Sequence, residues 1–173
     1  NRDIEIATAS FGQGIAVTPI AMVRALSVLA NGGTLVTPYV VEKIDFEDGF
    51  RVDARTSDAT PRRVLSPEAS EEITRMLVTV VDDALLGGTV KLPHYSVAAK
   101  TGTAQIASPS GEYYDDRFLH SFFGYFPAYD PKFLIFFYIT EPKGVRYASE
   151  TLTYPFIDTV NFLTHYFNIP PDR

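Results

Sequence analysis

The segment from Ala98 to Gln105 places one lysine among small and hydroxyl-bearing side chains. It reads Ala-Ala-Lys-Thr-Gly-Thr-Ala-Gln, and Lys100 is its only charged residue. In a β-strand, Lys100 and Gly102 would point to one face and the two threonines, Thr101 and Thr103, to the other. A glycine inside a strand often marks the close approach of another backbone or a ligand. Two hydroxyls and an ammonium group suit a bound carboxylate, and a backbone N–H on a strand edge suits a developing oxyanion.

Two other interpretations of Lys100 need to be weighed. A phosphate-binding loop would place a glycine directly before the lysine and another five residues before that pair. Ala99 precedes Lys100, and no glycine lies between Gly88 and Gly102, which excludes such a loop. A solvated lysine on an ordinary strand stays open, because Lys-Thr-Gly alone is a short pattern that occurs by chance.

Three helices are predicted around this segment. Thr18-Pro19 is a capping and first-turn pair, and the apolar run that follows to Ala30 predicts a helix that is buried on most sides and stops at Asn31-Gly32-Gly33. Ser66-Pro67-Glu68 starts an amphipathic helix that ends before Gly87-Gly88. The third helix follows Gly144, with apolar residues at helical spacing and a proline that should sit in its first turn or kink it; these residues are Phe156, Ile157, Val160, Leu163, Phe167 and Pro155.

Short strands fill most of the remaining chain. Residues Leu35 to Val41 are expected to be extended, and the turn Glu47-Asp48-Gly49 predicts a hairpin that joins Val40–Ile44 to Phe50–Val52. Three longer strands are predicted at Ser96–Gln105, Leu119–Phe126 and Lys132–Thr140, the last two as antiparallel neighbours. Polar stretches at Asp53–Arg63 and Ser108–Arg117 are predicted to be loops. The order helix, β-ribbon, helix, three strands, helix predicts an α+β fold in which helices cover an antiparallel sheet.

Composition limits the function classes. The chain has 173 residues with 46% hydrophobic content, which suits one domain with a real core, and a net charge of −6, which argues against a nucleic-acid-binding surface. It has no cysteine. The longest apolar run, Phe133–Ile139, has seven residues, against roughly 20 for a membrane span. We expect no metal or cofactor, because the three histidines are dispersed, and we interpret the adjacent aspartate pairs as solvated charge; these residues are His94, His120, His165, Asp82-Asp83 and Asp115-Asp116.

A family resemblance extends from the first motif to most of the chain. Lys-Thr-Gly, together with Ser-x-x-Lys and a Ser-x-Asn element, marks β-lactamases and penicillin-binding proteins. Gly87-Gly88-Thr89 followed by Tyr95–Gln105 closely resembles the third active-site element of penicillin-binding protein transpeptidase domains. Segments on both sides resemble the monofunctional, class B group in order and spacing, from about residue 8 to about residue 167; they are Ser10–Gly14 with Thr18-Pro19, Ala30–Gly33, Thr37-Pro38, and Ser121–Ala128 with Glu141-Pro142.

The resemblance implies a serine acyl-transfer enzyme that cross-links peptidoglycan stem peptides and is acylated by β-lactams, without a cofactor. It implies catalytic roles for Lys100, which supplies positive charge, and for Thr103, whose backbone N–H forms half of an oxyanion hole. Thr101, Gly102 and Thr103 would bind the carboxylate end of the substrate or antibiotic. Gln105 would line the same groove.

Two motifs of the family are absent from this sequence. No serine is followed three residues later by lysine, and no Ser-x-Asn triplet occurs. In the family both lie N-terminal to the region that Asn1 begins. We therefore expect residues 1–173 to be the C-terminal part of a single transpeptidase domain, inactive without the first sheet strands and the helical lobe. The resemblance further implies a parent protein on the extracytoplasmic face of the bacterial membrane, anchored by an N-terminal segment and working with division or elongation proteins.

Two alternatives remain at this point. Within the same superfamily, the chain could come from a D,D-carboxypeptidase or a serine β-lactamase, although the segments around Gly12-Gln13-Gly14 and Ser121–Pro127 favour the class B transpeptidases. From a different class, a non-catalytic module could keep the fold as a penicillin sensor or interaction domain. The sequence upstream of Asn1 separates these alternatives.

Overall fold

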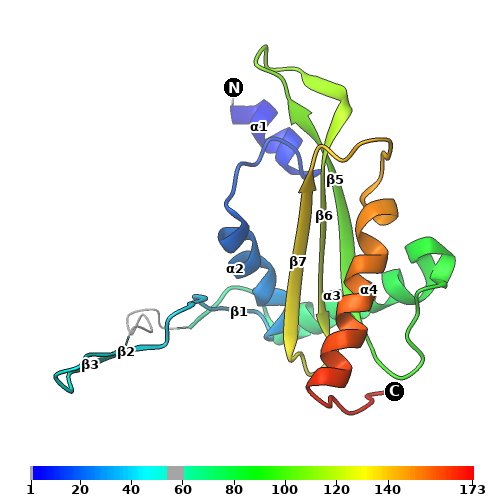
Figure 1. Cartoon of the computed structure of the whole chain (residues 1–173). Coiled ribbons are helices and arrows are strands. Elements are labelled where there is room, and N and C mark those ends of the chain that lie inside the picture. The colour runs from blue at the N-terminus through cyan, green and yellow to red at the C-terminus, as the bar shows by residue number, and fades with distance from the viewer. Residues whose placement is uncertain (1, 54–60) are drawn as a thin grey trace.

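A three-stranded antiparallel sheet lies at the centre of the structure, a computed structural model that describes residues 2–53 and 61–173. Its strands are β5 (Ala98–Ala107), β6 (Tyr113–Phe126) and β7 (Phe133–Thr140), in the order β5-β6-β7 (Figure 1). All three predicted strands are therefore present, and the predicted antiparallel pairing of the last two is confirmed.

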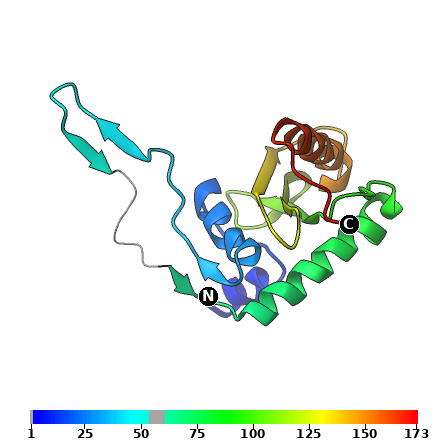
Figure 2. The ribbon, with the colours of Figure 1, turned by 90° about the horizontal axis from the view of Figure 1, so that it is seen from below.

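Helices cover both faces of this sheet (Figure 2). Helix α4 (Ala148–Tyr166) packs on one face, where the rings of Phe122 and Phe156 stack with centroids 4.4 Å apart. Helices α2 (Pro19–Ala30) and α3 (Pro67–Thr79) lie on the other face, where the buried hydroxyls of Thr74 and Tyr125 are 2.7 Å apart. The predicted α+β fold is confirmed.

The predicted helix starts are confirmed by their caps. The Thr18 hydroxyl accepts a hydrogen bond from the Ala21 N–H, and the Ser66 hydroxyl accepts one from the Ala69 N–H. After α3 the chain continues as a π-helical turn, η1 (Val80–Ala84), and a 3-10 turn, η2 (Leu85–Gly88). The amphipathic helix thus ends near the predicted glycine pair, but its last two turns change their hydrogen-bonding pattern.

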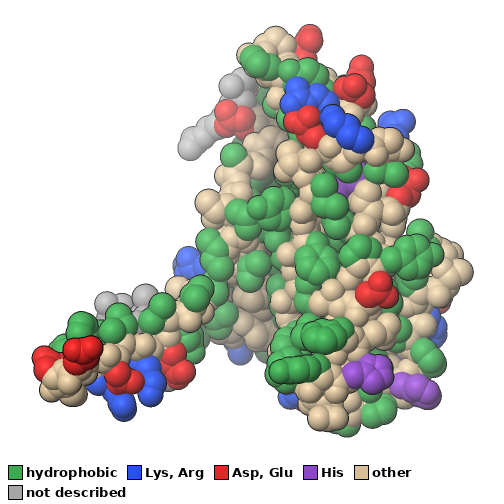
Figure 3. Space-filling model, in the orientation of Figure 1, with side chains coloured by type: hydrophobic (Ala, Val, Ile, Leu, Met, Phe, Trp, Pro, Cys, Tyr) green, Lys and Arg blue, Asp and Glu red, His purple; other side chains and the backbone are tan. Residues whose placement is uncertain are grey.

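A β-hairpin projects away from the rest of the molecule (Figures 1 and 3). It consists of β2 (Lys43–Asp45) and β3 (Arg51–Asp53), as the turn residues predicted. At its base, β1 (Thr34–Leu35) pairs with β4 (Arg62–Arg63). The predicted extended segment is therefore a regular strand only at Leu35. The loop predicted for residues 53–63 is wrong at its two ends: Asp53 pairs with Lys43 in the hairpin, and residues 62–63 pair with β1. Residues 54–60 lie outside the described residues.

Two further predictions need correction, and one helix was missed. Helix α1 (Arg2–Ala9) was not predicted. Helix α2 is not buried on most sides: Val28 is its only buried residue, and Ile20 remains 57% exposed, because the neighbouring elements cover one side of the helix. Residues 113–117 belong to β6 and not to a loop, because the ladder with β5 continues past a bulge to the pair Ala107 and Tyr113. The sequence of these residues is as polar as that of a loop because this end of the β5-β6 ribbon is exposed.

Of the two alternatives predicted for Pro155, a place in the first turn is wrong, because the residue lies well inside α4. A proline there removes one backbone hydrogen bond. The helix continues because the residues directly after the proline, Phe156 and Ile157, and Val160 one turn on are buried against the sheet. Tertiary packing thus offsets the lost bond.

The contact between α4 and the sheet leaves no room for a side chain at Gly124. A Cβ there would lie 2.4 Å from Phe156 Cζ and 2.8 Å from both the Ala98 carbonyl oxygen and Ala99 Cβ. These neighbours belong to a buried ring and to the adjacent strand, so they cannot move aside separately. Gly124 is therefore required for the close approach of α4.

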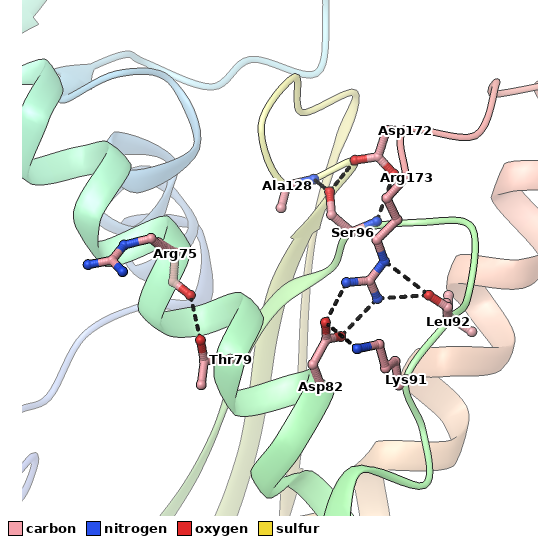
Figure 4. A network of polar contacts seen from close by, with 9 residues as sticks. All are labelled: Arg75, Thr79, Asp82, Lys91, Leu92, Ser96, Ala128, Asp172 and Arg173. Atoms are coloured by element: carbon pink, nitrogen blue, oxygen red, sulfur yellow. Dashed lines mark hydrogen bonds and ion pairs between the residues drawn. The ribbon is translucent and has the colours of Figure 1, made fainter.

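The C-terminal residues are joined to the start of β5 by a polar network (Figure 4). The Asp172 carboxylate accepts hydrogen bonds from the backbone N–H of Ser96, at 2.7 Å, and from its hydroxyl. The Arg173 guanidinium pairs with Asp82, whose second cation is Lys91 at 3.3 Å. Partial burial acts to raise the pKa of the Asp82 carboxyl, but the hydrogen bonds and charges of the two cations outweigh it and leave that pKa lowered.

We expect Gly124→Ala to lower the free energy of unfolding by about 3 kcal/mol, because the new methyl group overpacks the α4 contact. Gly102→Ala is the matched control. Its Cβ would meet only the Ser121 hydroxyl, at 2.5 Å, and that hydroxyl can rotate away, so the expected loss is below about 1 kcal/mol. Urea unfolding of both variants measures the difference. Equal losses would contradict the packing argument.

We expect Asp82→Asn to lower the free energy of unfolding by about 2 kcal/mol at pH 7, since it weakens charged hydrogen bonds. The folded-state pKa lies below the unfolded value of about 3.9, so this stabilisation is present above that value and is lost as the pH falls through the folded pKa. The difference from the wild type should therefore shrink at pH 3. Asp83→Asn, at the exposed neighbouring carboxylate, is the control and should change little at either pH.

Candidate active site

The candidate site lies along the edge of β5 that faces away from β6. Strand β5 is the first in the order β5-β6-β7, and among residues 2–53 and 61–173 no strand pairs with its other edge. The backbone groups on that edge are therefore not used in the sheet. Their identity follows from the register of the two strand pairs.

Hydrogen bonds at the two ends of β6 show which of its residues direct their backbone N–H and C=O groups toward β7 and which direct them toward β5. The carbonyl groups of Phe118 and Phe126 accept hydrogen bonds from Glu141 and Lys132, at 2.8 and 3.0 Å, so these residues direct their groups toward the β7 side. Direction alternates along an antiparallel strand, so Ser121 directs its groups toward β5. Its register partner Gly102 then bonds to β6. The neighbouring residues of β5 consequently direct their N–H and C=O groups to the open edge; these residues are Thr101, Thr103 and Gln105.

The side chains of the motif divide between the two faces as predicted. Thr101 and Thr103 are register partners of Phe122 and His120, whose side chains contact α4. Lys100 and Gly102 therefore point to the α2 and α3 face. The Lys100 ammonium nevertheless reaches the open edge, because its Nζ donates a hydrogen bond to the Thr101 carbonyl oxygen at 2.9 Å. A cation, two hydroxyl-bearing residues and the Thr103 N–H thus lie along one edge.

The Thr103 hydroxyl has a partner that the sequence did not suggest. Its Oγ1 accepts a hydrogen bond from the backbone N–H of Ala148, at 3.0 Å, in the first turn of α4. A hydroxyl that accepts one hydrogen bond keeps its own hydrogen for another acceptor. Thr103 can therefore still donate to a ligand anion.

Gly102 and Gln105 make contacts within the sheet. The glycine was expected to mark the close approach of a backbone or a ligand, but the space beside Gly102 is filled by the side-chain hydroxyl of Ser121. The Gln105 Nε2 donates a hydrogen bond to the Tyr114 carbonyl oxygen at 3.1 Å. One N–H of the Gln105 amide is thus used to hold β6, and its second N–H and its amide oxygen remain for a ligand.

An apolar cavity of about 630 Å³ adjoins the motif on the α2 side. Among the residues that form its walls, the sequence predicted a ligand-binding role for Gly102 and Thr103, which belong to the Lys-Thr-Gly-Thr motif. The cavity is lined by residues 11–12, 15–19 and 22 from the chain before and within α2, and by Gly102, Thr103, Ala104, Leu119, Ser121, Phe136 and Tyr138 from the sheet. The motif thus borders a space of ligand size.

An ion pair joins β6 to the residue that follows β7. The Arg117 guanidinium bonds to the Glu141 carboxylate and lies over the Tyr114 ring, 4.3 Å from its centroid. The hydrogen bond from Arg117 lowers the pKa of Glu141 and raises that of Arg117 itself. Glu141 is therefore an ionised carboxylate that is paired with Arg117.

The remaining candidate groups do not converge on a site. Within residues 2–53 and 61–173, no group of three or more His, Cys, Asp or Glu side chains could hold a metal ion. His120 is buried between β6 and α4. Of the aspartate pairs, Asp83, Asp115 and Asp116 are exposed as predicted, whereas the side chain of Asp82 is only 11% exposed and ion-paired, because the distant Arg173 folds back onto it. In the same ranges, no helix is both long and apolar enough to cross a bilayer.

Solved structures with the same fold include transpeptidase proteins. Penicillin-binding protein 3 of Mycobacterium tuberculosis, complexed with aztreonam, superposes with a TM-score of 0.78 at 27% identity, covering 96% of this chain and 39% of that chain. The transpeptidase domain of Burkholderia pseudomallei penicillin-binding protein 3 gives a TM-score of 0.75 at 28% identity, covering 100% of this chain and 49% of that chain.

Sequence comparison agrees with the structural likeness. Stage V sporulation protein D of Bacillus subtilis is 34% identical over 157 residues, which cover 91% of this chain and 24% of that protein. The chain thus spans about a quarter of the length of this relative. The family model described as penicillin binding protein transpeptidase domain matches residues 1–160. Because that match covers nearly the whole chain, the chain belongs to the penicillin-binding protein transpeptidase family.

Proposed function

We propose that residues 1–173 form the C-terminal part of a single transpeptidase domain in a peptidoglycan D,D-transpeptidase. This enzyme cross-links stem peptides by serine acyl transfer and is acylated by β-lactams. The observation that carries the proposal is the open edge of β5, where the Lys100 ammonium lies at the Thr101 carbonyl and the Thr103 N–H has no strand partner among the described residues.

Each group on this edge has a defined task in acyl transfer. The hydroxyls of Thr101 and Thr103 bind the carboxylate of the D-Ala terminus or of a β-lactam, and Lys100 supplies positive charge. The attacking serine oxygen forms a bond to the carbonyl carbon, and the carbonyl oxygen becomes an oxyanion that the Thr103 N–H stabilises. Gly102 belongs to the same binding strand, and Gln105 lines its far end.

The nucleophile and its proton relay come from other parts of the protein in this proposal. Neither Ser-x-x-Lys nor Ser-x-Asn occurs in the 173 residues. The remaining part of the same domain would supply both, so that a serine oxygen reaches the cavity beside Gly102 and Thr103. The partners of the chain are therefore this remaining part, the stem peptides and β-lactams, and division or elongation proteins.

The names of the relatives favour a transpeptidase over the superfamily alternatives. A relative from Nephroselmis olivacea, 32% identical over 197 residues, is named a peptidoglycan D,D-transpeptidase homolog. A carboxypeptidase, a β-lactamase or a penicillin sensor would use the same open strand edge. We further propose that the protein works on the extracytoplasmic face of the membrane, held by an N-terminal anchor, because stem peptides are cross-linked there.

We expect Lys100→Ala in the complete protein to slow acylation by fluorescent penicillin by one to three orders of magnitude, which is roughly the effect of losing a charged or oxyanion-type contact. Lys132→Ala is the matched control, since that exposed lysine pairs with Asp130 at the turn between β6 and β7. Stopped-time gel labelling gives the rates. An unchanged rate for Lys100→Ala would make Lys100 an ordinary solvated lysine.

We expect the complete protein to be labelled covalently by fluorescent penicillin and residues 1–173 alone to remain unlabelled, because the serine nucleophile is proposed to lie elsewhere. Mass spectrometry of peptides from the complete protein should place the adduct on the serine of a Ser-x-x-Lys motif. An adduct on any serine within residues 1–173 would contradict the proposal, and an unlabelled complete protein would favour the non-catalytic alternative.

A further inference from the structure

His120 is a buried histidine to which the proposed mechanism gives no task. It has no exposed surface, and it is the register partner of Thr103 on the neighbouring strand, so both side chains lie on the α4 face. Its Nε2 is 2.9 Å from the Arg146 carbonyl oxygen, and its Nδ1 is 2.9 Å from the Thr151 hydroxyl. Since a carbonyl oxygen can only accept, Nε2 carries a hydrogen. Both ring nitrogens are thus engaged.

These two hydrogen bonds lie on either side of the residue that bonds to Thr103. Ala148, which donates its N–H to the Thr103 hydroxyl at 3.0 Å, follows Arg146 by two residues and precedes Thr151 by three. The imidazole ring therefore holds the chain entering α4 and the first turn of that helix against the sheet. The position of the Ala148 N–H relative to β5 depends on both contacts.

The Ala148 N–H in turn fixes the Thr103 hydroxyl. The bond uses one lone pair of Oγ1 and directs the O–H hydrogen away from the helix. The N-terminal end of a helix carries partial positive charge, which makes the O–H a better donor to an anion. A hydroxyl that is held in this way has less freedom to lose when a carboxylate binds.

We propose that His120 is a positioning residue for carboxylate recognition, acting through α4 and the Ala148 N–H on Thr103. The proposal rests on the proposed function, because it assumes that Thr103 binds the ligand carboxylate. It predicts that loss of the imidazole weakens the selection for an anionic ligand, not acylation in general.

A purely structural role for His120 gives a different result. A buried histidine whose two nitrogens are satisfied also stabilises the fold, and its removal would then slow acylation by all ligands alike. The ratio of acylation rate constants for benzylpenicillin and for its uncharged methyl ester separates the two roles, because the two compounds share the reacting ring and differ in the carboxylate.

The experiment measures this ratio in the complete protein by mass spectrometry of the acyl adduct, with the melting temperature recorded for each variant. We expect His120→Leu to lower the ratio about tenfold with little change in the ester rate. His120→Gln should keep it within about threefold of the wild type, because its amide can replace the Nε2 donor to Arg146. Thr151→Val keeps the ring and removes its Nδ1 partner, together with the hydrogen bond that the Thr151 hydroxyl donates to the Ala148 carbonyl oxygen at 3.3 Å. It should lower the ratio by about threefold and covers the case in which His120→Leu does not fold.

Thr74→Val and Thr103→Val are the controls. Thr74→Val breaks the buried contact with Tyr125 on the opposite face, so it should reduce the melting temperature and leave the ratio unchanged. Thr103→Val should lower the ratio, and adding His120→Leu to it should lower the ratio no further.

If Thr103→Val lowers the ratio while the folded His120 and Thr151 variants do not, the positioning role is wrong and the proposed function stands. If Thr103→Val leaves the ratio unchanged, the carboxylate role of Thr103 is wrong and the positioning role is wrong with it.

Discussion

Within the described part of the chain, β5 pairs with another strand along one edge only, and the candidate site depends on this constraint. In an antiparallel strand, successive residues direct their backbone groups to opposite sides. Because Gly102 bonds to β6, Thr101 and Thr103 must present theirs at the open edge. If the register shifted by one residue, Gly102 would present its backbone groups at the open edge in place of Thr101 and Thr103. Each side chain of β5 would also move to the opposite face of the sheet. The same pairing that builds the sheet thus decides which N–H is available to an oxyanion.

Helix α4 connects the core of the domain to this edge. The helix lies close to the sheet because Gly124 has no side chain, and Phe156 fills the space above it and stacks on Phe122. The first turn of the same helix donates the Ala148 N–H to Thr103. Gly124, near one end of the sheet, and the Thr103 hydroxyl, near the middle of β5, therefore both contact the same helix.

Local signals in the sequence predicted most of the fold. The caps at Thr18 and Ser66, the turn before Phe50 and the three apolar strands are decided by neighbouring residues, and all are confirmed. The errors concern long-range packing. Pro155 is tolerated because buried neighbours hold α4, and Asp82 is shielded because Arg173 folds back from the end of the described chain. No local pattern contains that information.

In the candidate site, too, some features follow from the local sequence and others depend on long-range packing. Alternation along one strand was sufficient to predict that Lys100 and Thr103 point to different faces. It could not show that the Lys100 ammonium bends back to the Thr101 carbonyl, nor that a helix N–H holds the Thr103 hydroxyl. The Thr103 contact depends on how β5, α4 and the loop between β7 and α4 meet, and the Lys100 contact joins adjacent residues of β5. Since every one of them is made between described residues, the carboxylate-binding half of the proposed site is already arranged by the packing of this chain itself, and a serine brought to it would meet a preorganised edge.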